Sequence, residues 1–498
     1  MPSADIALDP RPRLFEARRK VFPRRVDGIF RRLKWAIMAV TLAIYYVTPW
    51  LRWDRGAYAP DQAVLVDLAH RRFYMFSIEI WPNEFYYVVG LLIMAAVGLF
   101  LVTSAVGRAW CGYACPQTVW TDLFVHVERA IEGDRNAQIR LDRAPWGVEK
   151  IARRGTKFAI WLLIAMSTGG AWIFYFADAP TLAREFLTGT APFVAYSTVG
   201  ILTCTTFTLG GFLREQVCIY MCPWPRIQSA MMDEKSLTVT YKDWRGEPRT
   251  HGLKRAQAHE AEAASSLVRM AQGEKVGDCI DCNACVAVCP TGIDIREGPQ
   301  IGCITCGLCI DACDEIMEKV DRSTRLIGYT TEADMKRARA GEMPVPPMKR
   351  LLRPRTIVYF MIWAGIGCGM LFALGTRTHM GVSVLQTRNP LWVRLSDGAI
   401  RNTYTVKLRN MEGRPRDFVV TLSGIDARMW TDGGSRETAG RTVTITVPAD
   451  RVGKAQVFVI APAQGPQRSA LLFTATAVDD RKAAASDSSY FERPEANP

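Results

Sequence analysis

Two copies of one cysteine motif decide what this chain can be: residues 279–290 read CIDCNACVAVCP, and residues 303–314 read CITCGLCIDACD. Each copy has the spacing C-x₂-C-x₂-C-x₃-C. This spacing is typical of bacterial ferredoxins, in which three neighbouring thiolates bind one [4Fe–4S] cluster and the fourth cysteine binds the other cluster. We therefore predict two clusters, with the ligand sets Cys279, Cys282, Cys285 and Cys313, and Cys289, Cys303, Cys306 and Cys309.

A pair of zinc sites is the alternative interpretation of these eight cysteines. Zinc sites usually combine two C-x₂₋₄-C pairs, whereas each copy here has three cysteines in a row and a more distant fourth. Asp314 stands where Pro290 follows the first copy, but proline shapes only the turn and is not a ligand. The motif therefore predicts an electron-transfer module rather than a zinc domain.

The composition indicates a membrane protein. The chain has 498 residues, is 49% hydrophobic and carries a net charge of +13. Apolar runs of about 20 residues, long enough to cross a bilayer, account for the high hydrophobic fraction. The basic residues flank these runs, so membrane topology explains the charge better than nucleic-acid binding does. Fourteen cysteines, none after Cys368, favour thiolates kept reduced in a cytoplasm over a disulfide framework.

About five membrane spans are expected. A signal peptide is not indicated at the N-terminus, so the first span is predicted to remain uncleaved with its N-terminus inside. The Lys and Arg residues between the second and third spans, and before the fifth, predict that these segments are cytoplasmic. Five spans then place the C-terminal domain in the periplasm. The expected spans are about 35–51, 85–106, 158–177, 191–213 and 355–375.

A second repeat, C-x₃-C-P, ends each of the first two pairs of spans. Cysteines four residues apart share one helix face, and the proline stops or kinks the helix. Four thiols brought together would suit Cu(I), zinc or another iron–sulfur centre. The alternative is small residues that pack where helices cross. Because the two pairs match in sequence and depth, we predict a copper or redox site formed by Cys111, Cys115, Cys218 and Cys222.

The C-terminal part of the chain changes character. From residue 376 onward, short segments such as TYTVKLRN and RTVTITVPA alternate apolar with polar or β-branched residues. Such spacing predicts an antiparallel, immunoglobulin-like β-sandwich, here without a disulfide because this part holds no cysteine. Residues 481–498 are predicted to be disordered.

The expected fold is an α-helical polytopic membrane protein with an inserted 2[4Fe–4S] ferredoxin-like module and a C-terminal all-β sandwich. Cys204 and Cys368, within spans, are interpreted as core packing, and a charged helix is expected over residues 254–272. The predicted layout is a basic cytoplasmic N-terminus (1–34), a four-span membrane domain (35–229), a cytoplasmic segment (230–350) with the module at about 270–320, a fifth span (351–376), a periplasmic sandwich (377–480) and a disordered tail (481–498).

The chain resembles the FixG/RdxA/CcoG family of membrane ferredoxins, the cytochrome c oxidase accessory proteins. More distantly, it resembles the polyferredoxin subunits of nitrate and nitrous oxide respiration. The resemblance covers nearly the whole length. The segments that carry it are RRVDGIFRRLKW, RRFYMFSIEIWP, WCGYACPQ, CIYMCPWPR, the double cysteine motif ending in CIDACDE, RPRTIVY and RNTYTVKLRN.

This resemblance implies a role in building the cbb₃-type cytochrome oxidase in the bacterial inner membrane. The implied activity is reduction of Cu(II) to Cu(I), with the two clusters as electron carriers and the C-x₃-C-P cysteines as the copper or extra redox site. Oxidase assembly proteins, copper transporters and a cytoplasmic electron donor would be partners, and nucleic acid would not. Two alternatives remain open: a redox-sensing scaffold without turnover, and an electron conduit to quinone through a cleft near Trp81.

Overall fold

The computed structural model describes residues 20–494 except 57–58, 250–276, 344, 347–348, 350–351, 379 and 481–483. The chain divides into two compact units. The first, called the helical unit, comprises Met1–Trp50, Leu65–Arg72 and Ile80–Gly367. The second, called the β unit, comprises Leu51–Val64, Phe73–Glu79 and Cys368–Pro498. The helix predicted over residues 254–272 lies outside the described residues.

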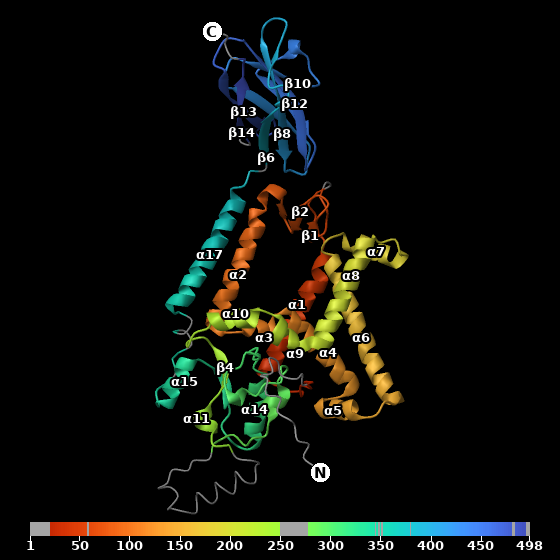
Figure 1. The fold of residues 1–498 in the computed structure, drawn as a ribbon, viewed down its shortest axis with the longest axis vertical. Helices are drawn as coiled ribbons and strands as arrows, with labels where there is room; N and C mark the ends of the chain where they lie inside the picture. Colours follow the sequence, from red (N-terminus) through yellow and green to blue (C-terminus); the bar gives the residue numbers. More distant parts are fainter. Residues whose placement is uncertain are drawn as a thin grey trace, which may run out of the picture. The chain divides into compact units, whose positions relative to one another are not determined.

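Four helices in the described part of the chain are long and apolar enough to cross a membrane. None of the residues in the apolar stretch of the last helix is buried by protein, so its side chains require an apolar solvent such as lipid. The last of these helices nevertheless contacts the helix Tyr86–Val106, because Trp363 lies over Gly98. The four are α2 (Tyr86–Val106), α6 (Val148–Ile173), the segment Phe193–Met221 and α17 (Pro354–Gly375) (Figure 1).

The first predicted span is not confirmed, and its predicted boundary is wrong. Helix α1 covers Ile29–Val47, so Arg31, Arg32 and Lys34 belong to the helix rather than to a preceding cytoplasmic segment. The apolar remainder, from Trp35 onward, is only about 20 Å long, against about 30 Å of hydrocarbon in a bilayer. Arg31 and Lys34 are 5% and 2% exposed, because a carboxylate inside the helical unit binds them. Sequence periodicity does not reveal such a partner.

The segment between α1 and α2 holds short elements. These include β1 (Val64–Asp67), β2 (Arg72–Met75) and β3 (Ile78–Ile80), which form a sheet in the order β1-β2-β3. Trp81 follows this sheet and is 5% exposed, and the guanidinium of Arg72 lies over its ring at 4.0 Å.

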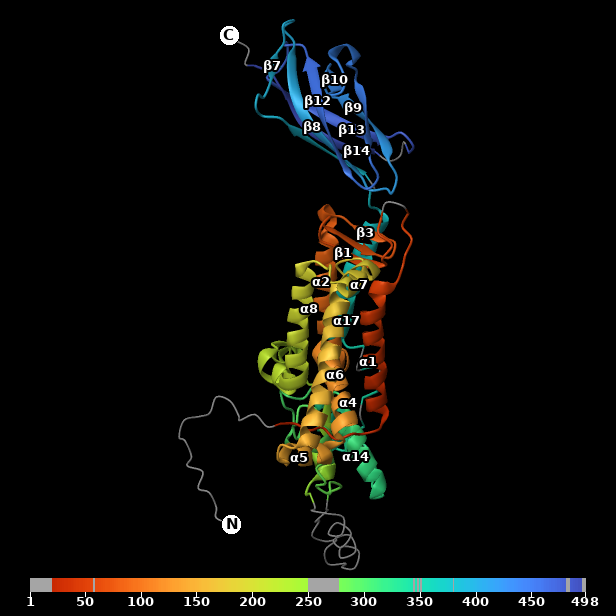
Figure 2. The same cartoon turned by 90° about the vertical axis from the view of Figure 1, so that its right-hand side faces the viewer.

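The helical unit contains a small aromatic core. Phe124 and Trp161 are buried and stacked, with ring centroids 5.3 Å apart. A Cβ added at Gly211 would lie 2.9 Å from the Trp161 ring. The segment Phe193–Met221 can therefore pack this closely against Trp161 because it has a glycine there. The shorter elements of the helical unit include α3 (Ala109–Tyr113), α4 (Pro116–Glu132), α5 (Arg135–Arg143), α7 (Ala179–Thr188) and α10 (Trp224–Met231). Figure 2 shows α5 and α7 at opposite ends of α6.

The segment Phe193–Met221 is not a regular α-helix. It consists of α8 (Phe193–Thr206), the π-helical stretch η3 (Phe207–Leu213), the single turn α9 (Arg214–Gln216) and the π-helical stretch η4 (Val217–Met221). Cys222 caps the last stretch. π-helical turns are rare and recur at functional sites.

The ferredoxin module is larger than predicted. Strand β4 (Thr238–Tyr241), which precedes the cysteine motif, pairs antiparallel with β5 (Ile327–Thr330), which follows it. The predicted limits of about 270–320 are therefore too narrow. Strands of four residues are too short to give a clear alternating pattern. The remaining elements of the module are α11 (Asp243–Gly246), α13 (Ala284–Val288), η5 (Ile295–Glu297), α14 (Leu308–Lys319) and α15 (Glu332–Arg339).

The β unit contains the predicted sandwich. One sheet has the strand order β10-β12-β8-β6, with β7 also paired to β8, and the other has the order β11-β9-β13-β14. Alternate residues of β8 are buried, as expected for a strand with one face on a core. The strands are β6 (Met380–Gln386), β7 (Val393–Arg394), β8 (Ile400–Asn410), β9 (Arg416–Ser423), β10 (Arg428–Thr431), β11 (Thr442–Val447), β12 (Val452–Ala461), β13 (Arg468–Ala477) and β14 (Ala484–Glu492).

The prediction of a disordered tail from residue 481 is wrong for the described residues. Strand β14 pairs with β13 along its length, from Arg468 opposite Glu492 to Thr476 opposite Ala484. Its composition is small and polar, which is why the sequence indicated disorder. The backbone ladder and one large buried side chain, Phe491, hold the strand instead.

Candidate functional site

The first predicted ligand set comes together in the ferredoxin module. Burial raises the pKa of Cys313 to about 12, and the neighbouring thiols of Cys285, Cys282 and Cys279 act in the same direction. Asn283 has a left-handed backbone (φ 55°) that turns the chain between Cys282 and the start of α13. The distant Cys313 is thus brought back to its three predicted partners by α14.

The second predicted set also comes together. Burial raises the pKa of Cys309 well above its usual value, and the thiols of Cys306, Cys289 and Cys303 contribute in that order. Cys285, which belongs to the first set, also raises the pKa of Cys309, so the two sets are adjacent. Gly307, with φ +75°, makes the turn before α14.

The cysteines of the two C-x₃-C-P motifs form a third set, called here the four-thiol group. Burial raises the pKa of Cys111 to about 12, and the thiols of Cys115, Cys218 and Cys222 act in the same direction, against the charge of Arg108. Cys111 lies in α3, Cys115 caps α4, and the other two lie at the end of the π-helical segment. Two segments far apart in sequence therefore meet as the repeat predicted.

The four-thiol group lies directly against the ferredoxin module. A Cβ added at Gly112 would lie 2.6 Å from the backbone oxygen of Ile304 and 3.1 Å from the Cα of Cys306. The hydroxyl of Tyr113 donates to the backbone oxygen of Cys306 over 2.8 Å. The guanidinium of Arg108 donates to the backbone oxygen of Cys303 over 3.1 Å. Helix α3 thus touches the loop that carries two of the predicted cluster ligands.

Sequence reasoning missed several residues around this contact. The thiol of Cys111 donates to Oε1 of Gln228 over 3.0 Å, and Gln228 is 0% exposed. Tyr329 donates to the backbone oxygen of Thr305 over 2.5 Å, and its hydroxyl is 3.3 Å from that of Tyr113. Only Gly112 and Tyr113 offered a signal, because they lie inside the first C-x₃-C-P motif.

A buried group of charges lies beside the four-thiol group. Asp122 accepts from Arg31 over 2.8 Å and is 3.7 Å from the ammonium of Lys34. Burial alone would raise the pKa of Asp122, but Lys34 and Arg31 lower it below its usual value. A cavity of about 40 Å³ is lined by these three side chains, by Cys218 and by Thr291 of the module. These charges therefore lie beside both Cys218 and the part of the module around Thr291.

Helix α14 binds the start of α1. Asp311 lies between Cys309 and Cys313 and accepts the backbone N–H of Arg31 over 2.8 Å and that of Phe30 over 3.3 Å. A carboxylate at a helix N-terminus is stabilised by the helix dipole and the free N–H groups. This contact fixes the module to the helix that supplies Arg31 and Lys34.

The remaining two cysteines do not have their predicted place. Cys204 in α8 and Cys368 in α17 are exposed, not packed in the core. Helices that face lipid have apolar surfaces outside as well as inside, so apolar surroundings in the sequence do not reveal which face is covered.

Comparisons with known protein families agree with the fold and the cysteine sets. Residues 213–332 match a model described as a 4Fe-4S dicluster domain, and residues 88–132 match a 4Fe-4S binding domain. Residues 370–494 match the IG-like fold at the C-terminus of FixG. The chain thus has iron–sulfur regions of the ferredoxin type, an immunoglobulin-like C-terminal domain and membrane helices.

Three curated proteins are similar along most of their length. The nitrogen fixation protein FixG of Rhizobium meliloti is 55% identical over 90% of this chain and 88% of its own. Proteins RdxA and RdxB of Cereibacter sphaeroides are 52% and 54% identical, covering 94% and 90% of this chain and 95% and 90% of their own. More than half of the residues are identical over about nine-tenths of each chain. The chain therefore belongs to the FixG/RdxA family of membrane iron–sulfur proteins.

Proposed function

We propose that this chain transfers single electrons from its ferredoxin module to the four-thiol group, and there reduces Cu(II) to Cu(I) for assembly of a cbb₃-type cytochrome c oxidase. The single observation that carries the proposal is the contact of Gly112 and Tyr113 with the loop of Cys306. Because electron transfer slows steeply with distance, a redox site in van der Waals contact with a cluster-binding loop is placed to exchange electrons with it.

The eight cysteines of the module are proposed as the ligands of two [4Fe–4S] clusters, which supply one-electron storage when bound. The thiols of each predicted set lie near one another in the module. The second set, which touches α3, would deliver the electron, and the first would receive it from a cytoplasmic donor. The proposed sets are Cys279, Cys282, Cys285 and Cys313, and Cys289, Cys303, Cys306 and Cys309.

Copper is proposed as the substrate on the grounds of ligand chemistry and family resemblance. Cu(II) gains one electron and becomes Cu(I), the oxidation state that soft thiolates prefer. The product would then pass to oxidase assembly proteins or copper transporters. The electron balance needs only one electron per copper ion from the module, and no proton.

Helix α1 is proposed as a fifth span. Its 19 residues measure about 29 Å, close to the thickness of the hydrocarbon layer. The hydroxyl of Tyr45 donates to the backbone oxygen of Thr168, and Tyr175 donates to the backbone oxygen of Tyr45 over 3.0 Å. Helix α1 therefore ends where α6 ends, and Asp122 rather than lipid meets its buried cations.

Five spans would place the N-terminus and module in the cytoplasm and the β unit in the periplasm of the bacterial inner membrane. Alkaline phosphatase, active only in the periplasm, should be active when fused after Pro498 and inactive when fused after Arg249. Equal activity at the two sites would mean that α17 does not cross the membrane. Because α1, α2, α6 and the segment Phe193–Met221 all lie between the N-terminus and Arg249, five spans also predict that a protease-sensitive tag at the N-terminus lies on the same side as one after Arg249. Tags on opposite sides would mean that α1 is not a span.

The proposed activity is tested with the anaerobically purified, dithionite-reduced protein. Addition of Cu(II) should reoxidise the clusters and form Cu(I), trapped by a chelator, in equal amounts. The variant Cys111→Ser/Cys218→Ser should slow this reaction, whereas Cys204→Ser/Cys368→Ser, with both changes on exposed faces of the spans, should not. Clusters that stay reduced in the presence of copper would exclude the proposal and favour a redox-sensing scaffold.

The quinone alternative receives no comparable support. It needs an open cleft beside Trp81, but that ring is 5% exposed and covered by the guanidinium of Arg72. Copper reduction is therefore the preferred proposal.

A further inference from the structure

We propose that the four-thiol group binds an iron–sulfur cluster of its own, a third [4Fe–4S] centre shared between the two C-x₃-C-P motifs. This inference rests on the proposed direction of electron transfer. It makes this centre the last relay, so that copper is reduced beside the cluster and is not bound by its four thiolates. Cys111 and Cys115 would supply half of the ligands from α3 and the start of α4. Cys218 and Cys222 would supply the other half from the π-helical end of the second pair of helices.

The first argument is the number of ligands. The region that matches a 4Fe-4S binding domain, residues 88–132, contains Cys111 and Cys115 but no other cysteine. Two thiolates leave two of the four irons of a cubane without a protein ligand. The thiol of Cys111 is 3.0 Å from the side chain of Gln228, which lies six residues after Cys222, so the second motif lies beside the first. Cys218 and Cys222 also raise the pKa of Cys111, and they complete the set of four.

The second argument is the contact between the two C-x₃-C-P segments. Gln117, two residues after Cys115, donates its side-chain amide to the backbone oxygen of Leu209 over 2.9 Å and to that of Arg214 over 3.3 Å. Arg214 lies four residues before Cys218. These hydrogen bonds join the start of α4 to the π-helical segment and hold the two cysteine pairs side by side.

The third argument is charge. A [4Fe–4S] core of charge 2+ with four thiolates carries a net negative charge, which must be balanced when it is removed from water. Two buried cations, Arg31 and Lys34, line the same cavity as Cys218, and the buried guanidinium of Arg108 acts on Cys111. The cavity wall also includes Arg129 and Arg214, against the two acids Asp122 and Glu215. This excess of positive charge in the cavity lining suits a cluster of net negative charge.

The fourth argument is a buried hydrogen-bonding group aimed at a sulfur. The side-chain amide of Gln228 is 3.0 Å from Sγ of Cys111, and its other end is 3.3 Å from the hydroxyl of Thr103. The nitrogen and oxygen of such an amide exchange places by a flip. In the flipped orientation the N–H donates to a thiolate and the oxygen accepts from Thr103. Hydrogen bonds to sulfur are one means by which proteins set cluster potentials.

The test is a count of metal and sulfide in the full-length protein, purified anaerobically. Three clusters predict about twelve iron atoms and about twelve sulfides per chain, four for each cluster. The variant Cys111→Ser/Cys218→Ser should lose about a third of both, while the electron paramagnetic resonance signals of the module remain. The matched variant Cys204→Ser/Cys368→Ser should keep the full amount. About eight iron atoms in both the wild type and the first variant would overturn the proposal.

A second variant keeps the proposal testable if the cysteine changes prevent folding. Gln228→Leu should retain the iron and shift the midpoint potential of one centre only. If all midpoint potentials and spectroscopic signals stay as in the wild type, the result counts against a cluster at Cys111. The outcomes also separate this inference from copper reduction. Twelve irons without Cu(I) formation would leave the third centre and exclude the activity, and eight irons with Cu(I) formation would do the reverse.

Discussion

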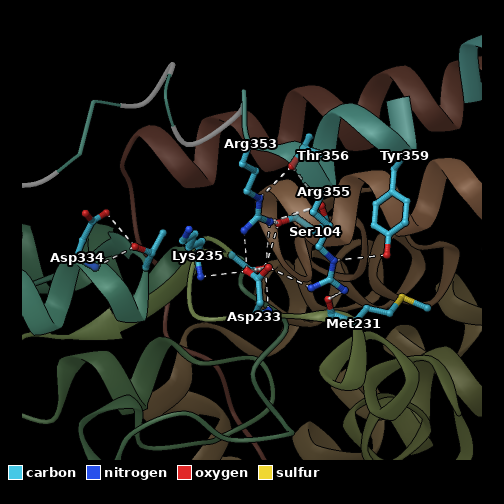
Figure 3. Close-up of polar contacts among 11 residues, drawn as sticks. Ser104, Met231, Asp233, Lys235, Asp334, Arg353, Arg355, Thr356 and Tyr359 are labelled. Carbon is cyan, nitrogen blue, oxygen red and sulfur yellow. Dashed lines mark hydrogen bonds and ion pairs between the residues drawn. The ribbon is translucent and has the colours of Figure 1, made fainter. Parts of the chain in front are cut away.

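Arg353, just before α17, donates to the carboxylate of Asp233 over 2.6 Å, and this ion pair fixes the last membrane helix to the segment between α10 and the module. Arg355 reaches the same carboxylate over 3.1 Å from the first turn of α17. Figure 3 shows both arginines pointing to Asp233. Ser236 also donates to this carboxylate, over 3.0 Å. One carboxylate thus connects the second C-x₃-C-P segment, the module and the last span.

The variant Asp233→Asn should destabilise the helical unit. Hydrogen bonds between charged groups contribute about 1.5–3 kcal/mol, and this carboxylate is partly exposed, so a loss of roughly 1–2 kcal/mol is expected. Thermal unfolding in nanodiscs measures the loss. The variant Lys235→Gln, which changes an exposed side chain beside Asp233, is the matched control and should unfold like the wild type.

The same ion pair predicts a pH dependence. Burial opposes ionisation of Asp233, but the hydrogen bonds from Arg353 and Ser236 lower its pKa below the usual value. Its stabilising contribution is therefore complete above the unfolded-state pKa of about 4 and is lost as the pH falls through the lower folded-state pKa. The difference in unfolding temperature between wild type and Asp233→Asn should shrink toward acid. A difference that grew toward acid would contradict this account.

The variant Gly112→Val should interrupt electron transfer without removing iron. Any Cβ at this position meets the backbone oxygen of Ile304 at 2.6 Å, so α3 and the loop of Cys306 must separate. We expect normal iron content and several-fold slower reoxidation of the module by Cu(II), measured by stopped-flow absorbance. Gly155→Ala, where nothing lies within 4 Å of the added Cβ, is the control. An unchanged rate would mean that electrons leave the module by another route.

The grouping of the cysteines could be predicted from the sequence, because motif spacing is a local property of the chain. The two module sets and the four-thiol group needed only motif spacing and a repeat. Their neighbours were not predictable in this way. Gln228 and Tyr329 reach the site from elements far from the motifs, and nothing in their local sequence marks them.

The errors in the fold have one physical cause, which is tertiary partners that override local pattern. Lys34 looked like a solvated charge at a membrane surface, but Asp122 makes its burial possible. Strand β14 looked disordered, but β13 supplies a complete backbone ladder. Helix α1 began earlier than predicted because Asp311 accepts its first N–H groups. None of these partners is near in sequence.

The variant Lys34→Met should lower the midpoint potential of the centre at Cys218. A buried positive charge stabilises an added electron, so its removal makes reduction less favourable. Arg31 still pairs with Asp122 in this variant, which limits structural damage. Potentiometric titration should show a shift to more negative values, and Arg32→Met, on the exposed side of α1, should show none.

The opposite substitution supplies a check on the sign. In Asp122→Asn the two cations remain without their carboxylate, and the potential should move to more positive values. Shifts in the same direction for Lys34→Met and Asp122→Asn would indicate structural disturbance, and the electrostatic account would be wrong.

The variant Phe473→Ala should destabilise the β unit alone. Phe473 of β13 is 0% exposed and lies in a core made only of residues from the sandwich, including Tyr404 and Phe418. Truncation of a buried phenylalanine costs about 3–5 kcal/mol. The neighbouring Leu472 is 42% exposed on the opposite face of the strand, so Leu472→Ala should cost much less.

Calorimetry of the full-length protein should show one transition shifted downward in Phe473→Ala, with iron content and Cu(II) reoxidation rate unchanged. If the iron is lost as well, the two units do not unfold independently, and the sandwich contributes to the stability of the cluster sites.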